Sequence, residues 1–180
     1  MTASSEGTAP DVARLVEVLD RHGVDYLVVG GVATRFYGAE RPTWDFDCLV
    51  RRTRGNFERL AMSMRELNAR LRVEGMTDDE AAELPTQVHA ETIARMEIST
   101  WRTDAGDLDI LVDIPNRQGH RMGYDDLVVA ARSLDQGGLV VKVAGLSDII
   151  ASKEWADRPK DHEALPELHV LQARLDQAEE

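Results

Sequence analysis

The sequence VVGGVATRFYGAERPTWDFD, residues 28–47, joins an apolar segment, a glycine pair and two aspartates that stand two positions apart. The apolar run at 26–29 predicts a buried strand that ends in a tight turn at the glycine pair. Asp45 and Asp47 begin the next predicted strand, and side chains two apart on a strand point to the same face. The stretch therefore predicts a carboxylate pair on one face of a strand, preceded by a glycine turn.

Such a carboxylate pair needs compensating charge, because neighbouring carboxylates repel each other unless a cation lies between them. Mg²⁺ takes hard oxygen ligands and is commonly held by one or two carboxylates together with substrate phosphates. Gly30 and Gly31, which precede a predicted helix at 32–37, offer close backbone approach and free N–H groups for phosphate oxygens. Aspartates at this spacing are also common as solvated surface pairs or helix caps. The glycine turn and the apolar strand favour the metal site.

A third carboxylate from a neighbouring strand would complete this site. The predicted strand at 108–114 places Asp107, Asp109 and Asp113 on one face. Asp109 is flanked by apolar residues on both sides, so it is the favoured ligand. Asp107 remains the alternative and is otherwise a turn residue.

Across 180 residues, the hydrophobic pattern predicts one compact mixed α/β (α+β) domain with a small sheet and a helical C-terminal third. We expect a disordered tail at 1–9, a core at 10–144, and a helical segment at 145–180 that packs on the core. The predicted strands are 26–29, 46–50, 93–101, 108–114 and 139–143. The predicted helices are 10–22, 32–37, 55–73, 124–132, 147–155 and 160–177, with a capping box at 77–80 that opens another short helix.

Composition limits the classes of function. The net charge of -12 disfavours a large, non-specific nucleic-acid binder, although a local basic patch can act within an acidic protein. No apolar run approaches the roughly 20 residues that span a bilayer. The start of the chain lacks the basic and apolar regions of a secretory signal, and the single cysteine, Cys48, has no internal partner. We therefore expect a cytoplasmic protein that is not in a membrane.

The segment 30–47 resembles the signature of the nucleotidyltransferase superfamily, in which a glycine pair precedes two aspartates separated by one residue. With Gly38, Arg41 and Thr43 it is similar to a subset of bacterial proteins. These are the toxins of the AbiEii and MenT type and some aminoglycoside nucleotidyltransferases. The superfamily's third aspartate lies on a later strand, which fits Asp109.

A second part of the resemblance lies in segment 145–161, which is similar to the toxin group's lysine-and-aspartate segment. It implies that Lys153, with Arg158 or Lys160, neutralises a triphosphate and that Asp161 belongs to the nucleotide site. The residues also have plainer interpretations. Lys153 could be an exposed lysine, Arg158 and Lys160 could be solvated charges at a helix end, and Asp161 is favourable at a helix N-terminus in any case.

The resemblance implies a nucleotidyltransferase fold and a magnesium-dependent reaction, with two Mg²⁺ ions expected. A nucleoside monophosphate would pass from a nucleoside triphosphate (NTP) to an acceptor, with release of pyrophosphate. Asp45 and Asp47 would bridge both ions, Asp109 would help to activate the nucleophile, and Lys153 would assist catalysis. The implied nucleotide contacts are Gly30, Gly31, Thr43, Lys153, Arg158, Lys160 and Asp161.

The acceptor implied by the toxin group is the 3′ end of tRNA, whose modification blocks aminoacylation and translation, with a cognate antitoxin protein as partner. The arginines at 51–72 form either a solvated helix face or a contact for an RNA backbone. Trp44 either stacks on a base or belongs to the core. The alternatives are a small-molecule acceptor, such as an aminoglycoside, and transfer of AMP to a protein.

Overall fold

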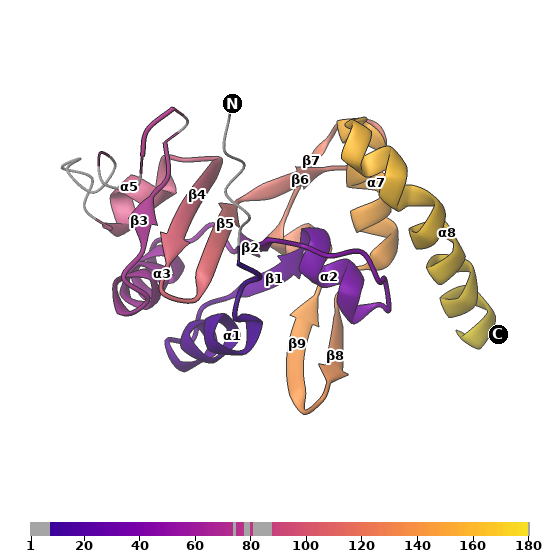
Figure 1. Ribbon diagram of the computed structural model, residues 1–180, viewed down its shortest axis with the longest axis horizontal. Coiled ribbons are helices and arrows are strands. Elements are labelled where there is room, and N and C mark those ends of the chain that lie inside the picture. Colours follow the sequence, from indigo (N-terminus) through magenta and orange to yellow (C-terminus); the bar gives the residue numbers. More distant parts are fainter. Residues whose placement is uncertain (1–7, 74, 78–79, 81–87, 180) are drawn as a thin grey trace.

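The computed structural model describes residues 8–73, 75–77, 80 and 88–179. Most of the expected disordered tail, residues 1–7, lies outside the described residues. Seven strands form the main sheet: β1 (Tyr26–Val29), β2 (Asp45–Val50), β3 (Arg70–Leu71), β4 (Ile98–Thr103), β5 (Gly106–Leu111), β8 (Arg132–Gln136) and β9 (Leu139–Val143). Their order across the sheet is β3-β4-β5-β2-β1-β9-β8 (Figure 1). A separate hairpin pairs β6 (Asp113–Pro115) with β7 (Arg121–Gly123).

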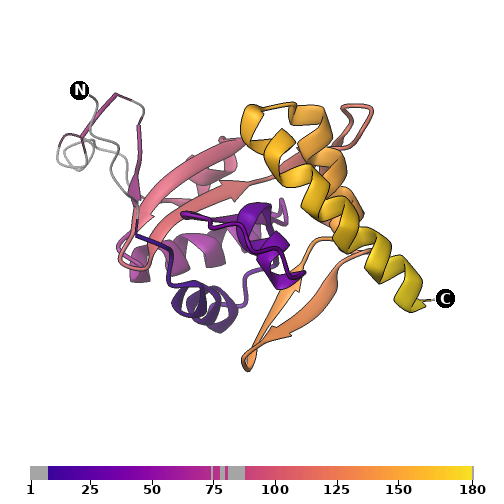
Figure 2. The same ribbon diagram turned by 45° about the vertical axis from the view of Figure 1, so that its right-hand side comes forward.

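Helices surround the sheet (Figures 1 and 2). They are α1 (Val12–Arg21), α2 (Gly30–Phe36), α3 (Arg54–Glu66), α5 (Ala90–Ala94), α6 (Tyr124–Leu127), α7 (Leu146–Ala156) and α8 (Pro159–Glu179). Helices α1 and α3 lie along one face of the sheet, whereas α7 and α8 lie beyond its other face (Figure 2). Among the described helices, none is both long enough and apolar enough to span a bilayer.

The register of the central strands decides where polar side chains meet. Strand β2 is antiparallel to β1 and parallel to β5, so that Asp47 lies opposite Asp109 and Asp45 lies opposite Asp107. The alternating residue Phe46 is fully buried in the core. Since successive side chains alternate between faces, the aspartates of β2 and β5 share the face away from this core.

The C-terminal helices attach through a small apolar cluster of their own. It contains Ala39, Leu146, Ile150, Ala164 and Leu168. Helices α7 and α8 join at Asp157, which has a positive φ of 49°. The cluster ties both helices to the loop between α2 and β2, and this loop leads directly into the carboxylate pair.

The helix expected at 55–73 ends early. Helix α3 stops at Glu66, and Asn68 adopts a positive φ of 51°. Asparagine tolerates this left-handed conformation, which commonly ends a helix. Arg70 lies on strand β3 and Arg72 directly follows it, so they do not lie on the helix face that the sequence predicts.

Other boundaries also differ from expectation. The strand expected at 93–101 begins only at Ile98, and the residues before it include the short helix α5. The strand expected at 108–114 is divided into β5 and β6, and the helix expected at 124–132 is the four-residue α6 followed by β8. The capping box at Thr77 and Glu80 is present as reciprocal hydrogen bonds, but most of the helix it was expected to open lies outside the described residues.

A substitution at Leu168 tests how α8 is attached to the rest of the protein. Its side chain is 1 % exposed, so Leu168→Ala leaves a cavity and lowers the free energy of unfolding by about 2–5 kcal/mol. The matched control is Val170→Ala, at a position that is 52 % exposed on the same helix, with a change below about 0.5 kcal/mol. Urea unfolding followed by circular dichroism measures both. Equal effects would contradict the packing of α8 described above.

Candidate functional site

Three carboxylates converge at the centre of the sheet. Asp45 and Asp47 come from β2 and Asp109 comes from the adjacent β5. One oxygen from each residue can be chosen so that all three lie within 4.8 Å of one another. Asp109, which the sequence favours as the third carboxylate, thus lies beside the pair.

Asp107 lies in the same strand but is engaged elsewhere. Its carboxylate accepts a hydrogen bond of 2.7 Å from Arg72 and another from Arg102. Its side chain is 16 % exposed. Asp107 is therefore a partner of two arginines, and the carboxylate that meets Asp45 and Asp47 is that of Asp109.

The three carboxylates make ionisation of Asp47 unfavourable. Burial, then the charges of Asp45 and Asp109, raise the pKa of Asp47 to about 7, against the opposing effect of Lys160 and Lys153. Burial and the neighbouring like charges thus favour the protonated form of Asp47, and a bound cation would favour the ionised form.

Asp109 also has a raised pKa, chiefly because of burial. A hydrogen bond from the Thr100 hydroxyl favours its ionised form, and the charges of Asp45 and Asp107 oppose it. Thr100 faces Asp109 directly across the β4–β5 ladder. The sequence analysis did not single out this threonine, because only the register of β4 reveals the contact.

The two glycines permit close approach to these side chains. A Cβ on Gly30 would lie 2.0 Å from Oδ2 of Asp47, and a Cβ on Gly31 would lie 2.4 Å from the Thr43 hydroxyl oxygen. Gly30 also has a positive φ of 63°, which other residues rarely adopt. The glycine pair therefore lets the start of α2 pack directly onto β2 and the loop before it.

The loop before β2 forms one wall of the site. The Thr43 hydroxyl donates a 3.0 Å hydrogen bond to Oδ1 of Asp45. Arg41 forms an ion pair with Glu163, and the backbone N–H of Glu40 donates to the Glu167 carboxylate at 2.8 Å. Because both glutamates belong to α8, the loop position depends on that helix.

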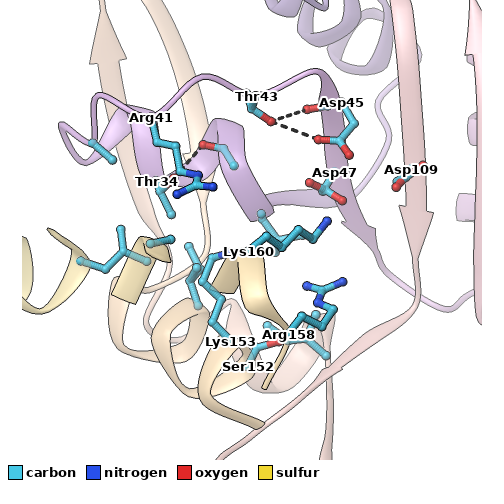
Figure 3. Close-up of a pocket in the computed structure, with 18 of the residues that line it drawn as sticks. Thr34, Arg41, Thr43, Asp45, Asp47, Asp109, Ser152, Lys153, Arg158 and Lys160 are labelled. Atoms are coloured by element: carbon cyan, nitrogen blue, oxygen red, sulfur yellow. Dashed lines mark hydrogen bonds between the residues drawn. The ribbon is translucent and has the colours of Figure 1, made fainter. Parts of the chain in front are cut away.

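Cations line the opposite wall, on α7, on α8 and in the short connection between them. The Asp161 carboxylate is fully buried and accepts hydrogen bonds from Lys153 at 3.0 Å and Arg158 at 2.6 Å. Burial opposes ionisation of Asp161, but these hydrogen bonds outweigh it and hold the pKa of its carboxyl below the usual range. Asp161 thus anchors two cations from beneath, and Lys160 projects toward Asp47 (Figure 3).

These walls enclose a cleft of about 680 Å³ between the carboxylates and the C-terminal helices (Figure 3). Among its lining residues are the site residues expected from the sequence, apart from Asp161: Gly30, Gly31, Thr43, Asp45, Asp47, Asp109, Lys153, Arg158 and Lys160. Thr34, Arg41 and Ser152 also line the cleft. Arg41 lies in the stretch that decides the fold, whereas nothing local in the sequence marks Thr34 or Ser152.

For Trp44 and for the arginines at 51–72, the structure decides between the interpretations that the sequence left open. Trp44 lines the cleft and is 56 % exposed, so it does not belong to the core. The arginines expected on one helix face divide among different partners. For example, Arg51 pairs with Asp125, Arg54 with Glu58 and Arg59 with Asp25.

A divalent cation fits the donor set. Oδ1 of Asp109 is buried and accepts no hydrogen bond from the described part of the chain. Three clustered carboxylates supply hard oxygen ligands, and magnesium completes its shell with water and phosphate oxygens. Asp45, Asp47 and Asp109 are the residues that would hold Mg²⁺.

Comparison with known proteins identifies the fold. No protein-family model matches the sequence, and no curated protein matches it either. The lincosamide antibiotic adenylyltransferase LnuA, solved with lincomycin bound, is similar in structure with a TM-score of 0.59 at 13% identity. The similarity covers 91% of this chain and 99% of LnuA.

The antibiotic-resistance factor ANT(2″)-Ia is similar as well. Its complex with adenylyl-2″-tobramycin gives a TM-score of 0.52 at 14% identity, over 94% of this chain and 97% of that one. Its solution structure gives a TM-score of 0.54 at the same identity, over 93% and 90%. The chain therefore has the fold of these nucleotidyltransferases, as the sequence predicts.

The raised pKa of Asp47 predicts that metal affinity depends on pH. Its pKa of about 7 means that the proton must leave before a cation binds, so Mg²⁺ binds about tenfold more weakly at pH 6 than at pH 8. In the metal-free protein, the contribution of Asp47 to stability is greatest below pH 4 and declines as pH rises through about 7. The increase in melting temperature on adding MgCl₂ should therefore be larger at pH 8. Asp47→Asn removes this pH dependence, and an equal increase at both pH values in the unmodified protein would contradict the assignment.

Asp161 supplies a second test of the site. Asp161→Asn removes the negative charge beneath Lys153 and Arg158 and lowers the free energy of unfolding by about 2 kcal/mol. Glu163→Gln is the matched control, because Glu163 lies on the same helix as Asp161, is 65 % exposed and pairs with Arg41 of the loop before β2. Its effect stays below about 1 kcal/mol. Chemical denaturation measures the free energy of unfolding of both variants. Equal losses in the two variants would refute the anchoring role of Asp161.

Proposed function

We propose that the protein is a magnesium-dependent nucleotidyltransferase, which transfers a nucleoside monophosphate from an NTP to an acceptor. The observation that carries the proposal is the pairing of three carboxylates with a group of cations across one cleft. Carboxylates that hold metal and cations that hold phosphates are the two parts that nucleotidyl transfer needs, because this chemistry depends on positioning and charge neutralisation. The shared fold of LnuA and ANT(2″)-Ia supports it.

In this reaction, each residue of the carboxylate wall would have a role that follows from its position. When bound, Mg²⁺ supplies positive charge that polarises the acceptor hydroxyl and the phosphate oxygens. Asp45 and Asp47 would hold the metal, with two ions expected, and Thr43 orients Asp45 through its hydrogen bond. Asp109 would complete the metal site beside them, and its raised pKa suits its carboxylate to accept the proton of the acceptor hydroxyl. The acceptor oxygen then bonds to the α-phosphorus, and pyrophosphate leaves.

The C-terminal helices neutralise the triphosphate and the departing pyrophosphate. Lys153, Arg158 and Lys160 face the carboxylates, and Lys153 is only 17 % exposed, so its charge acts with little screening by water. Asp161 contributes by holding two of these cations in place. Gly30 and Gly31 allow the nucleotide phosphates to approach the backbone at the start of α2.

For the acceptor, the resemblance of segments 30–47 and 145–161 to the AbiEii and MenT toxins supports the 3′ end of tRNA. The protein would then arrest translation, and a cognate antitoxin would restrain it. The likeness to LnuA, which is described as a lincosamide adenylyltransferase, supports a small-molecule acceptor as the second candidate. Transfer of AMP to a protein is a third outcome that the same assay detects.

Incubation of the protein with each α-labelled NTP, MgCl₂ and total tRNA tests the proposal. Label should appear at the RNA 3′ end and should disappear in the double variant Asp45→Asn, Asp47→Asn, with a loss of at least about a hundredfold. The control is Asp125→Asn, because Asp125 is 69 % exposed and outside the cleft. Transfer that survives in the double variant would refute the metal site. Labelling of lincomycin or tobramycin in place of RNA would select the second candidate.

A further inference from the structure

The loop between α2 and β2 carries a further cation of the cleft, Arg41, which has no role in the reaction proposed above. Arg41 lines the cleft, and its side chain points from the loop toward the wall that carries Lys153 and Lys160 (Figure 3). It lies on the side of the cleft away from Asp109 (Figure 3). Because the side chain of Arg41 is 42 % exposed, a ligand in the cleft can reach it.

The ion pair that holds Arg41 is one that a ligand can replace. Its partner is Glu163 on α8, whose side chain is 65 % exposed. Ion pairs between exposed side chains are weak, because water solvates both charges. A phosphate group accepts the same two parallel hydrogen bonds from a guanidinium as a carboxylate does. Arg41 can therefore exchange Glu163 for a phosphate without a large loss of favourable contacts.

The position of the loop does not depend on this ion pair alone. The backbone N–H of Glu40 donates a 2.8 Å hydrogen bond to the Glu167 carboxylate, which ties the loop to α8 without the side chain of Arg41. Ala39 of the same loop is buried in the apolar cluster that contains Leu168. The guanidinium of Arg41 can thus change partners while the backbone of the loop stays in place.

The cations assigned above to the triphosphate are partly neutralised within the protein. Lys153 and Arg158 share the buried carboxylate of Asp161, which offsets one of their two charges. A bound triphosphate adds negative charge to a cleft that already contains three carboxylates, so further positive charge in the cleft would stabilise it. Arg41 can supply that charge when it leaves Glu163.

The side of the cleft on which Arg41 lies indicates which phosphates it would meet. In the proposed reaction the acceptor hydroxyl approaches beside Asp109, and the attacking and leaving oxygens of such a transfer lie roughly in line. Pyrophosphate then departs from the opposite side of the α-phosphorus, which is the side of Arg41 (Figure 3). The start of α2 lies beside the same loop, since a Cβ on Gly31 would be 2.4 Å from the Thr43 hydroxyl oxygen.

We propose that Arg41 binds the β- and γ-phosphates of the nucleotide, and that it leaves Glu163 to do so. Glu163 then competes with pyrophosphate for the guanidinium, which favours release of pyrophosphate after transfer. This inference rests on the proposed nucleotidyl transfer. It adds to that reaction a phosphate-binding side chain and an exchange of its partner.

Magnesium tripolyphosphate is the probe, because it presents the phosphates without a base and without an acceptor. Isothermal titration calorimetry of the full chain at one ionic strength measures its affinity. Arg41→Met removes the guanidinium and Glu163→Gln removes its competitor, and the two changes are made singly and together. The matched controls are Arg54→Met and Glu58→Gln, which break an exposed ion pair on α3.

The two cleft variants should act in opposite directions. Arg41→Met should weaken binding about tenfold, because a charge-assisted hydrogen bond to phosphate is lost. Glu163→Gln should tighten binding about threefold, because only a weak exposed ion pair is removed. In the Arg41→Met background, Glu163→Gln should have no further effect, since the competition requires the guanidinium. Both controls should match the unmodified protein.

Other outcomes of the same titrations would overturn the exchange. If the ion pair only stabilised the loop, both single variants would weaken binding. If Glu163 acted only through its charge at a distance, Glu163→Gln would tighten binding equally with and without Arg41. Unaltered affinity in Arg41→Met would exclude phosphate binding by Arg41, and unaltered affinity in Glu163→Gln would exclude the competition.

Lys153→Met in the same assay separates this inference from the proposed function. This variant should weaken tripolyphosphate binding, because Lys153 belongs to the triphosphate site proposed above. If the unmodified protein failed to bind magnesium tripolyphosphate, the proposed function would be refuted together with the inference. Weaker binding in Lys153→Met with unchanged binding in Arg41→Met would refute the role of Arg41 alone.

Discussion

Electrostatic repulsion among Asp45, Asp47 and Asp109 is the constraint on which the site depends. One oxygen from each carboxylate lies within 4.8 Å of the other two, and burial together with these neighbours raises the pKa of Asp47 to about 7. Burying like charges in this way is unfavourable unless protons or cations compensate them. A bound cation would relieve this repulsion, and the surrounding chain supplies further positive charge from Lys160 and Lys153 and from Arg72.

Backbone packing makes that repulsion unavoidable. The glycine pair allows α2 to start in contact with Asp47 and Thr43, which leaves these side chains little room to move apart. On the other wall, Asp161 holds Lys153 and Arg158 through a carboxylate with no exposed surface. The small cluster around Leu168 fixes α8, and the glutamates of α8 fix the loop that precedes Asp45. Charge placement in the cleft is thus a consequence of how the C-terminal helices pack.

The sequence predicted those parts of the site that depend only on residues close together in the chain. Alternation along a strand predicted that Asp45 and Asp47 share a face, and the apolar run and glycine pair predicted the preceding strand and turn. The choice between Asp107 and Asp109 remained open, because it depends on the register of β2 against β5 and on arginines from β3 and β4. The end of α3 was misplaced because a single asparagine, Asn68, takes a left-handed conformation that apolar periodicity does not reveal. Strands β3 and β7 carry too few residues for a clear alternation, β8 contains a single apolar residue, and pairing with neighbours defines all three.

Because strand pairing gathers cations locally, the net charge of the whole chain does not describe the charge near the carboxylates. A net charge of -12 describes the average surface, but phosphates respond to charges within a Debye length, about 8 Å at physiological salt. Around the carboxylates, Lys160 and Lys153 act on Asp47 from one side and Arg72 acts on Asp109 from the other. The early end of α3 is what moves Arg70 and Arg72 from a predicted helix onto the sheet. Folding therefore places cations beside the carboxylates of a chain whose average surface is acidic.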